Sequence, residues 1–188
     1  MKDFSIIFMG TPEFAVEILK KLHSEGINIK AVVTAPDKPA GRGQKIHQSA
    51  VKEFAIANNL TVLQPTNLKD EAFIQEIQEL NADLFVVVAF RMLPEIIWNM
   101  PRCGTINLHA SLLPNYRGAA PINWALINGE KETGVTTFFI EKDIDTGKII
   151  EQAKVVIGDN EDIGSLYERL MKLGADVMLS TVHKIEKG

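Results

Sequence analysis

The chain has 188 residues, of which 46% are hydrophobic and 23% charged, and its formal net charge is −4. This size and composition fit one soluble domain with a sizeable core, and the acidic balance excludes a protein that binds polyanions over its whole surface. The single cysteine, Cys103, excludes an internal disulfide framework and a cysteine-based metal cluster. We find no apolar run of transmembrane length and no secretory signal segment, so we expect a cytoplasmic, monomeric protein.

The first part of the chain alternates apolar runs with amphipathic segments. Residues 4–10 form an apolar run that ends in glycine, which is typical of a central strand of a parallel sheet. In the next segment we expect a helix with Thr11 as its N-cap, Pro12 at its first position and Gly26 just beyond its end. Further strands are expected at 27–35, 60–65, 82–90 and 104–110, and helices at 49–59, 70–81 and 120–129. This alternation predicts an α/β fold with an open, mostly parallel, doubly wound (Rossmann-like) sheet.

The alternation stops near residue 130. Two apolar segments, 133–140 and 147–157, are separated by only the six residues EKDIDT. This connection is too short for a parallel crossover, so we expect an antiparallel hairpin. Residues 163–187 then place leucines at helical spacing, which predicts a long C-terminal helix packed on the sheet.

Polar side chains follow three of these apolar segments. Asn107 and His109 alternate along one predicted strand and therefore share a face. The turn AFRMLP (89–94) follows the most apolar strand, and Asp143 and Asp145 lie in the predicted hairpin turn. Because ligands bind beyond the carboxyl ends of the strands in open α/β sheets, we expect these groups to form one site.

The residue types at this site suit a reaction in which negative charge develops on a carbonyl oxygen. An asparagine amide donates a hydrogen bond, and a histidine with a carboxylate beside it is favoured in its charged form. The chain has no Gly-x-Ser-x-Gly motif, so formyl or acyl transfer by direct attack of the substrate is the simpler mechanism. The alternative is that Asn107 caps a turn and His109 is a hydrogen-bonded core histidine, and spacing alone does not separate the two.

Metal and nucleotide sites are not indicated. The other three histidines are scattered, and no spacing of histidine and cysteine resembles a zinc site, so we expect no metal. The stretch MGTPEF (9–14) follows a strand and opens a helix but lacks the Gly-x-Gly-x-x-Gly pattern. A tight turn before a helix explains this stretch slightly better than a nucleotide site does.

Two motifs carry a family resemblance. The stretch NLHASLLPNYRGAAP (107–121) resembles the signature of folate-dependent formyltransferases, and D-x-D-T-G (143–147) resembles their aspartate loop. Two further stretches, MGTPEFAV (9–16) and VVTAPDKPAGRGQK (32–45), are similar to the methionyl-tRNA formyltransferases within that family. The resemblance runs from Phe4 to about Ile157.

The resemblance implies a division of roles. It implies that Asn107, His109 and Asp145 are catalytic, that 10-formyltetrahydrofolate is the formyl donor, and that initiator methionyl-tRNA is the acceptor. The residues implied to bind the folate are Phe90, Arg91, Met92, Leu93, Ser111, Leu112, Pro114, Ile140, Glu141 and Asp143. The residues implied to bind tRNA are Gly10, Thr11, Lys38, Arg42, Lys45 and Arg117. We also expect a turn at Leu113–Pro114 and consider a cis bond there, although cis is a small minority of X–Pro bonds.

The resemblance also implies a domain boundary. Related methionyl-tRNA formyltransferases carry a C-terminal β-barrel, so we expect residues 1–188 to be the catalytic domain without that barrel, and to bind tRNA weakly alone. One alternative is a formyltransferase for a small amine such as an amino sugar, and another is an inactive folate-binding module. The basic loop 35–48, which we expect to be irregular and exposed, favours a tRNA substrate.

Overall fold

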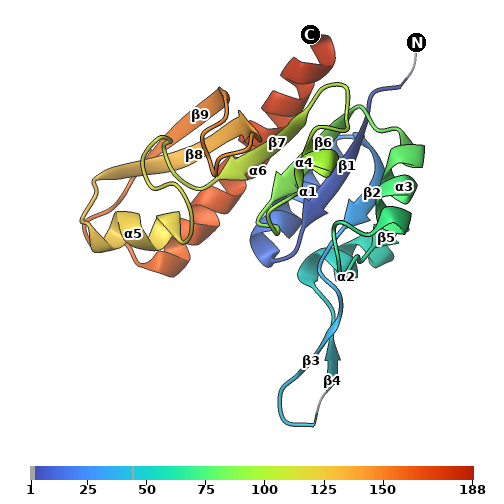
Figure 1. Ribbon diagram of the computed structural model, residues 1–188. Coiled ribbons are helices and arrows are strands. Elements are labelled where there is room, and N and C mark those ends of the chain that lie inside the picture. The colour runs from blue at the N-terminus through green and yellow to red at the C-terminus, as the bar shows by residue number, and fades with distance from the viewer. Residues whose placement is uncertain (1–2, 44) are drawn as a thin grey trace. The chain divides into compact units, whose positions relative to one another are not determined.

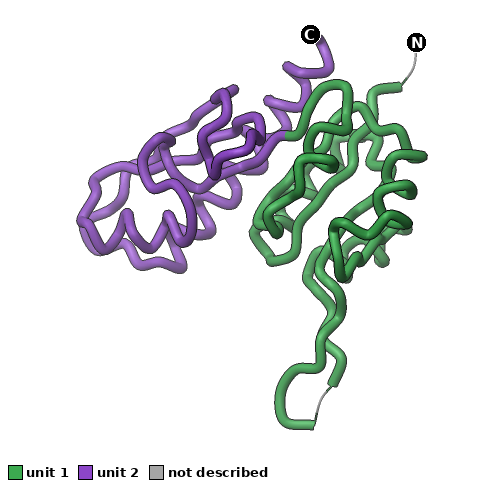
Figure 2. Tube along the Cα trace, viewed as in Figure 1, with its two compact units in different colours: residues 1–105 green, residues 106–188 purple. Residues whose placement is uncertain are grey.

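The computed structural model describes residues 3–43 and 45–188. The chain divides into two compact units, residues 1–105 and residues 106–188, which Figure 2 distinguishes by colour. The boundary falls at the start of the strand that carries Asn107 and His109, so the predicted catalytic residues all belong to the second unit.

The first unit is built on a parallel sheet. Its strands β1 (Ser5–Gly10), β2 (Asn28–Val33), β5 (Val62–Leu63) and β6 (Leu84–Val88) lie in the order β5-β2-β1-β6, and every pairing between them is parallel. All residues of β1 and β6 are buried, as their continuous apolar runs predict. Phe8 and Phe85 are among the largest fully buried side chains.

Four helices accompany this sheet: α1 (Glu13–Ser24), α2 (Ala50–Ala57), α3 (Glu71–Leu80) and the short α4 (Glu95–Trp98) (Figure 1). The prediction of Thr11 as the N-cap of α1 is wrong. Pro12 takes that position, with φ −84° and ψ 178°, and makes no side-chain capping bond. Gly26 ends the helix as expected, because its φ of 78° lies in the left-handed region that glycine tolerates best.

The basic loop is a regular hairpin, which corrects the expectation of an irregular segment. Strands β3 (Lys38–Ala40) and β4 (Lys45–His47) pair antiparallel, and all of their residues are exposed. The turn between them contains Gly41 and Gly43, both at positive φ. Figure 1 shows this hairpin extending away from the rest of the first unit. Strands of three residues show no readable alternation, and for this reason the pattern did not reveal them.

The second unit combines antiparallel strands with two helices. Strand β7 (Thr105–His109) enters it and pairs antiparallel with β8 (Glu132–Phe139), which pairs antiparallel with β9 (Ile149–Val156). Helix α5 (Pro121–Ile127) precedes β8, and the long helix α6 (Ile163–Lys187) packs against β8, β9 and α5. The α/β class, the parallel strands, the late hairpin and the C-terminal helix are all confirmed.

Candidate functional site

The end of β7 carries the two polar residues at the centre of the site. His109 is buried, with 8% of its surface exposed, and Asn107 is half-buried. On the neighbouring strand β8, His109 lies opposite Thr136 and Asn107 lies opposite Phe138. Because the two residues alternate along one strand, their side chains lie on the same face.

The imidazole of His109 lies between two acceptors. Its Nε2 atom is 2.6 Å from the carbonyl oxygen of Tyr116, and since a carbonyl only accepts, Nε2 carries the hydrogen. Its Nδ1 atom is 3.7 Å from Oδ2 of Asp145, which is ion-pair range but too long for a hydrogen bond. The Tyr116 carbonyl therefore sets the orientation of the ring. No feature of the sequence pointed to this backbone group.

Asp145 connects two loops of the second unit. Its Oδ2 atom accepts a hydrogen bond of 2.7 Å from the Gly118 backbone N–H, and its own carbonyl accepts one of 3.1 Å from Arg117 Nε. Asp145 has φ 53°, a strained value for a residue with a side chain. Two residues later, Gly147 leaves no room for a side chain, because a Cβ atom there would collide with the carbonyl of Phe139.

The side chain of Asn107 contains an oxygen that accepts no hydrogen bond from the described residues. Its amide oxygen Oδ1 is buried and has no hydrogen-bond partner anywhere in the described residues. A buried acceptor left in this state costs about 1–3 kcal/mol, so such groups need an explanation, for example a ligand that donates to them. The sequence indicated a donor at this position, and the structure adds an acceptor.

The segment after His109 is packed into the second unit. Ser111 is fully buried, and its hydroxyl donates to the carbonyl of Asn115 at 2.7 Å. Leu112 is half-buried and Pro114 exposed. The Leu113–Pro114 bond is cis, in agreement with the turn expected there.

In the first unit, the segment Phe90 to Leu93 follows β6. The Arg91 guanidinium lies over the Phe90 ring, 5.0 Å from its centroid, and donates to the carbonyls of Pro65 (2.8 Å) and Thr66 (3.2 Å). Burial lowers the pKa of the Arg91 guanidinium, and within the described chain its Nε atom has no partner. The expected folate residues differ widely in exposure here: Met92 is 70% exposed and Leu93 is 7% exposed.

The remaining predicted folate residues lie in the turn after β8. Ile140 is half-buried, whereas Glu141 and Asp143 are exposed. The role of these three residues in folate binding is a prediction.

The predicted tRNA residues fall into two groups. Lys38, Arg42 and Lys45 are exposed on the β3–β4 hairpin. At the base of this hairpin, a hydrogen bond from Lys52 Nζ (2.6 Å) and one from Gln64 lower the pKa of the Asp37 carboxyl, so Lys52 balances its charge.

The second group of predicted tRNA residues lies outside the β3–β4 hairpin. Gly10 is buried at the end of β1, where a Cβ atom would come within 2.7 Å of the Ala15 Cβ and 2.8 Å of the Val88 carbonyl. Its packing explains why glycine stands there. Thr11 is half-buried, and Arg117 is exposed with its guanidinium on the Asp145 carbonyl.

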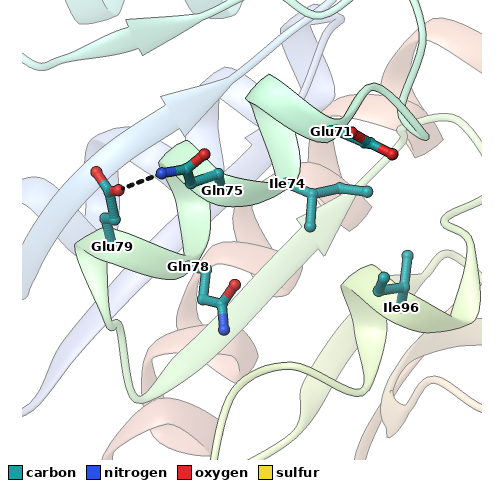
Figure 3. Close-up of a pocket in the computed structure, with 6 residues that line it drawn as sticks. All are labelled: Glu71, Ile74, Gln75, Gln78, Glu79 and Ile96. Atoms are coloured by element: carbon teal, nitrogen blue, oxygen red, sulfur yellow. Dashed lines mark hydrogen bonds between the residues drawn. The ribbon is translucent and has the colours of Figure 1, made fainter.

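One groove lies outside all of the predicted site residues. It has a volume of about 690 Å³ and lies on the surface formed by α3 and Ile96 of α4 (Figure 3). Its lining is two isoleucines among acidic and amide side chains, with Gln75 donating to Glu79 at 2.9 Å. Nothing in this lining indicates which ligand chemistry it would select.

Residues 3–43 and 45–188 contain no group of three or more His, Cys, Asp or Glu residues placed to hold a metal ion. None of the helices in this part of the chain combines the length and the apolar character needed to cross a membrane.

Several solved structures share this fold. Glycinamide ribonucleotide transformylase 1 from Symbiobacterium toebii superposes with a TM-score of 0.81 at 18% identity, covering 97% of this chain and 87% of that one. A formyltetrahydrofolate deformylase from Pseudomonas syringae gives a TM-score of 0.79 at 22% identity, covering 99% of this chain and 62% of the other. At these identities the likeness establishes the fold.

Sequence comparison is more specific. A protein named methionyl-tRNA formyltransferase from Flavobacterium johnsoniae is 61% identical over 188 residues, which are 100% of this chain and 60% of that protein. One of the same name from Bacteroides thetaiotaomicron is 59% identical over 98% of this chain and 57% of its own length. The chain thus spans less than two thirds of the curated relatives it matches. The family model described as "Formyl transferase" matches residues 3–182. Nearly the whole chain, including the strand and turn that hold His109 and Asp145, therefore belongs to the formyl transferase family.

Proposed function

We propose that this chain transfers the formyl group of 10-formyltetrahydrofolate to the α-amine of initiator methionyl-tRNA. The observation that carries the proposal is the arrangement at the end of β7, where His109 lies between the Asp145 carboxylate and the Tyr116 carbonyl. The names of relatives that are 59% and 61% identical to this chain support the acceptor.

The reaction needs no covalent enzyme intermediate. The amine nitrogen attacks the formyl carbon and forms a new C–N bond, and the carbonyl oxygen becomes an oxyanion. The bond from that carbon to N10 of the folate then breaks, the amine gives up a proton, and the released nitrogen takes one up. Enzymes accelerate such steps chiefly with donors aimed at the developing oxyanion.

Asn107 and His109 have complementary roles in this scheme. The Asn107 amide N–H and the imidazole N–H stabilise the oxyanion, while the buried Asn107 oxygen accepts a hydrogen bond from the attacking amine. Because the Tyr116 carbonyl accepts from Nε2–H, the donor to the oxyanion is Nδ1–H of the imidazolium. Asp145 stabilises that charge without a direct hydrogen bond.

The other predicted residues supply binding. Phe90 to Leu93, the segment from Ser111 to Pro114, and Ile140, Glu141 and Asp143 are the residues proposed to contact the folate. Among them, Met92 is 70% exposed. Lys38, Arg42 and Lys45 on the exposed hairpin, together with Arg117, would contact phosphates of the tRNA. No metal ion is required by this mechanism.

A formyl-transfer assay with rival acceptors tests the proposal. The chain is incubated with 10-formyltetrahydrofolate and, in parallel, with methionyl-tRNA, with an amino sugar, or with no acceptor, and the formylated product is quantified. We expect formylmethionyl-tRNA, and its loss in the His109→Ala variant. Formylation of the sugar alone would support the amino-sugar alternative instead. Folate binding without transfer to any acceptor, even at micromolar chain concentration, would support the inactive folate-binding module.

A further inference from the structure

The residue directly across the sheet from His109 is a buried threonine. Thr136 on β8 is the register partner of His109 on β7, and it is fully buried. Directly paired residues of an antiparallel sheet project their side chains from the same face and lie within contact distance of each other. The side chain of Thr136 therefore lies on the same face as His109, where it contacts residues 111–113, the segment that follows His109.

The hydroxyl of Thr136 makes three hydrogen bonds, two of them to that segment. It donates to the Ser111 carbonyl at 2.7 Å and accepts from the Leu113 backbone N–H at 3.1 Å. It also accepts from Nε2 of Gln152 at 2.9 Å. One donor and two acceptors are the whole capacity of a hydroxyl, so each of its bonding positions is occupied.

Gln152 on β9 completes the connection. Its Nε2 atom donates to the Leu113 carbonyl at 2.9 Å as well as to Thr136. Three backbone groups of Ser111 and Leu113 are thus held by two side chains on β8 and β9. These bonds tie the backbone of Ser111 and Leu113 to the two neighbouring strands.

We infer that Thr136, with Gln152, is a positioning residue for formyl transfer. It holds the backbone of residues 111–113 and thereby fixes where His109 and the beginning of the Tyr116 loop lie relative to the substrate. This inference rests on the proposed function, in which His109 acts on the formyl group. Displacements of about 1 Å at a reacting centre can reduce the rate about 100-fold, so a side chain that touches no substrate can still control turnover.

The adjacent residue is a matched control. Thr137 is also fully buried, but its hydroxyl lies 2.7 Å from that of Thr181 on α6. It faces away from His109, because neighbouring residues of a strand alternate in direction. Replacing either threonine with valine removes one buried hydroxyl at nearly constant volume, so the two variants differ in which segment they release.

The test compares Thr136→Val, Thr136→Ser and Thr137→Val in the formyl-transfer assay. We expect Thr136→Val to lower kcat about 10- to 100-fold, with the KM for folate and for methionyl-tRNA within about twofold of wild type. Thr136→Ser keeps the hydroxyl and should restore most of kcat. Thr137→Val should leave kcat within about twofold, even if it lowers the melting temperature as much. Folded Thr136→Val with wild-type kcat would overturn the inference.

A Gln152 variant and NMR spectra of the His109 ring test the positioning role independently of Thr136→Val kinetics. Gln152 is exposed, so Gln152→Leu should fold even if Thr136→Val does not, and we expect it to lower kcat about threefold or more. In NMR spectra, the His109 ring signals should move in Thr136→Val and stay unchanged in Thr137→Val. If wild-type chain transfers no formyl group, the proposed function fails, and these signals still test the positioning role. Unchanged His109 signals in Thr136→Val would refute it.

Discussion

The carboxylate of Asp145 faces His109 without bonding to it. Its Oδ2 atom lies 3.7 Å from the imidazole Nδ1 and takes its hydrogen bond from the Gly118 backbone N–H at 2.7 Å. Asp145 thus does two things: it places negative charge beside the histidine, and it fastens the loop 116–118. That loop supplies the Tyr116 carbonyl, which accepts from the other nitrogen of the same ring.

The first prediction concerns the two residues at the end of β7. His109→Ala and Asn107→Ala should each lower kcat about 100- to 1000-fold, the usual loss when one oxyanion donor is removed. Folate affinity and the circular dichroism spectrum should be unchanged, because neither side chain forms part of the apolar core. His183→Ala, a histidine on α6 that faces Glu186, is the control and should retain full activity. Turnover near wild type in either site variant would contradict its assignment.

The second prediction separates the charge of Asp145 from its bonds. Asp145→Asn keeps an oxygen for the Gly118 N–H but removes the negative charge beside His109, so we expect kcat to fall about 100-fold. Asp143→Asn removes a charge from the same turn, where the carboxylate is exposed, and should cost less than about threefold. Steady-state kinetics of both variants decides between the two carboxylates. Equal losses of kcat in the two variants would show that the rate depends on the total charge of the turn and not on the position of the Asp145 carboxylate.

The third prediction concerns the β3–β4 hairpin. Arg42→Ala should raise the KM for methionyl-tRNA and flatten its dependence on salt, because one phosphate contact and its released counterion are lost. Folate affinity should not change. Lys172→Ala on α6 removes the same charge from an exposed position and should leave both quantities unaltered. The measurement is the initial rate against tRNA concentration at several salt concentrations. Identical salt profiles for Arg42→Ala and wild type would remove the hairpin from the tRNA site.

The fourth prediction concerns acid stability. Asp83 is 1% exposed, and its burial alone would raise its pKa. The Arg102 guanidinium at 2.6 Å and the Ser5 backbone N–H at 2.9 Å outweigh this and hold the pKa of the Asp83 carboxyl below its ordinary value. A lowered folded-state pKa means that this carboxylate stabilises the fold above the unfolded-state pKa of about 3.9 and loses that contribution as the pH falls through the folded-state value.

Asp83→Asn should therefore lower the free energy of unfolding by about 1–3 kcal/mol at pH 7 and weaken its pH dependence below about pH 4. Urea titrations at pH 7, 5 and 3 measure both effects. Asp159→Asn, which removes an exposed partner of Lys131, should change stability by less than about 0.5 kcal/mol. If Asp83→Asn lost stability equally at all three pH values, the carboxylate's titration would not be the cause.

Sequence patterns predicted the elements whose periodicity reflects burial. The apolar runs of β1 and β6 are buried along their whole length, and the leucine spacing that predicts a helix at 163–187 matches α6 at both ends. Elements whose residues are all exposed left no such trace. Strands β3 and β4 are an example, because a three-residue exposed strand has the same composition as a loop.

For the site, the sequence by itself determined the chemical inventory: an amide and an imidazole on one strand face, carboxylates in a later turn, and cations in a loop with two prolines and two glycines. Alternation along a strand is local, so the shared face of Asn107 and His109 followed from their spacing alone. Only the tertiary structure decided which groups meet. The Tyr116 carbonyl on the histidine, the Gly118 N–H on Asp145 and the Thr136 hydroxyl beneath Ser111 depend on the register of β7 against β8 and on how the intervening loops close. Register and closure arise from packing between residues far apart in the chain, and backbone groups are the same in every residue, so no local pattern of side chains records where they bond.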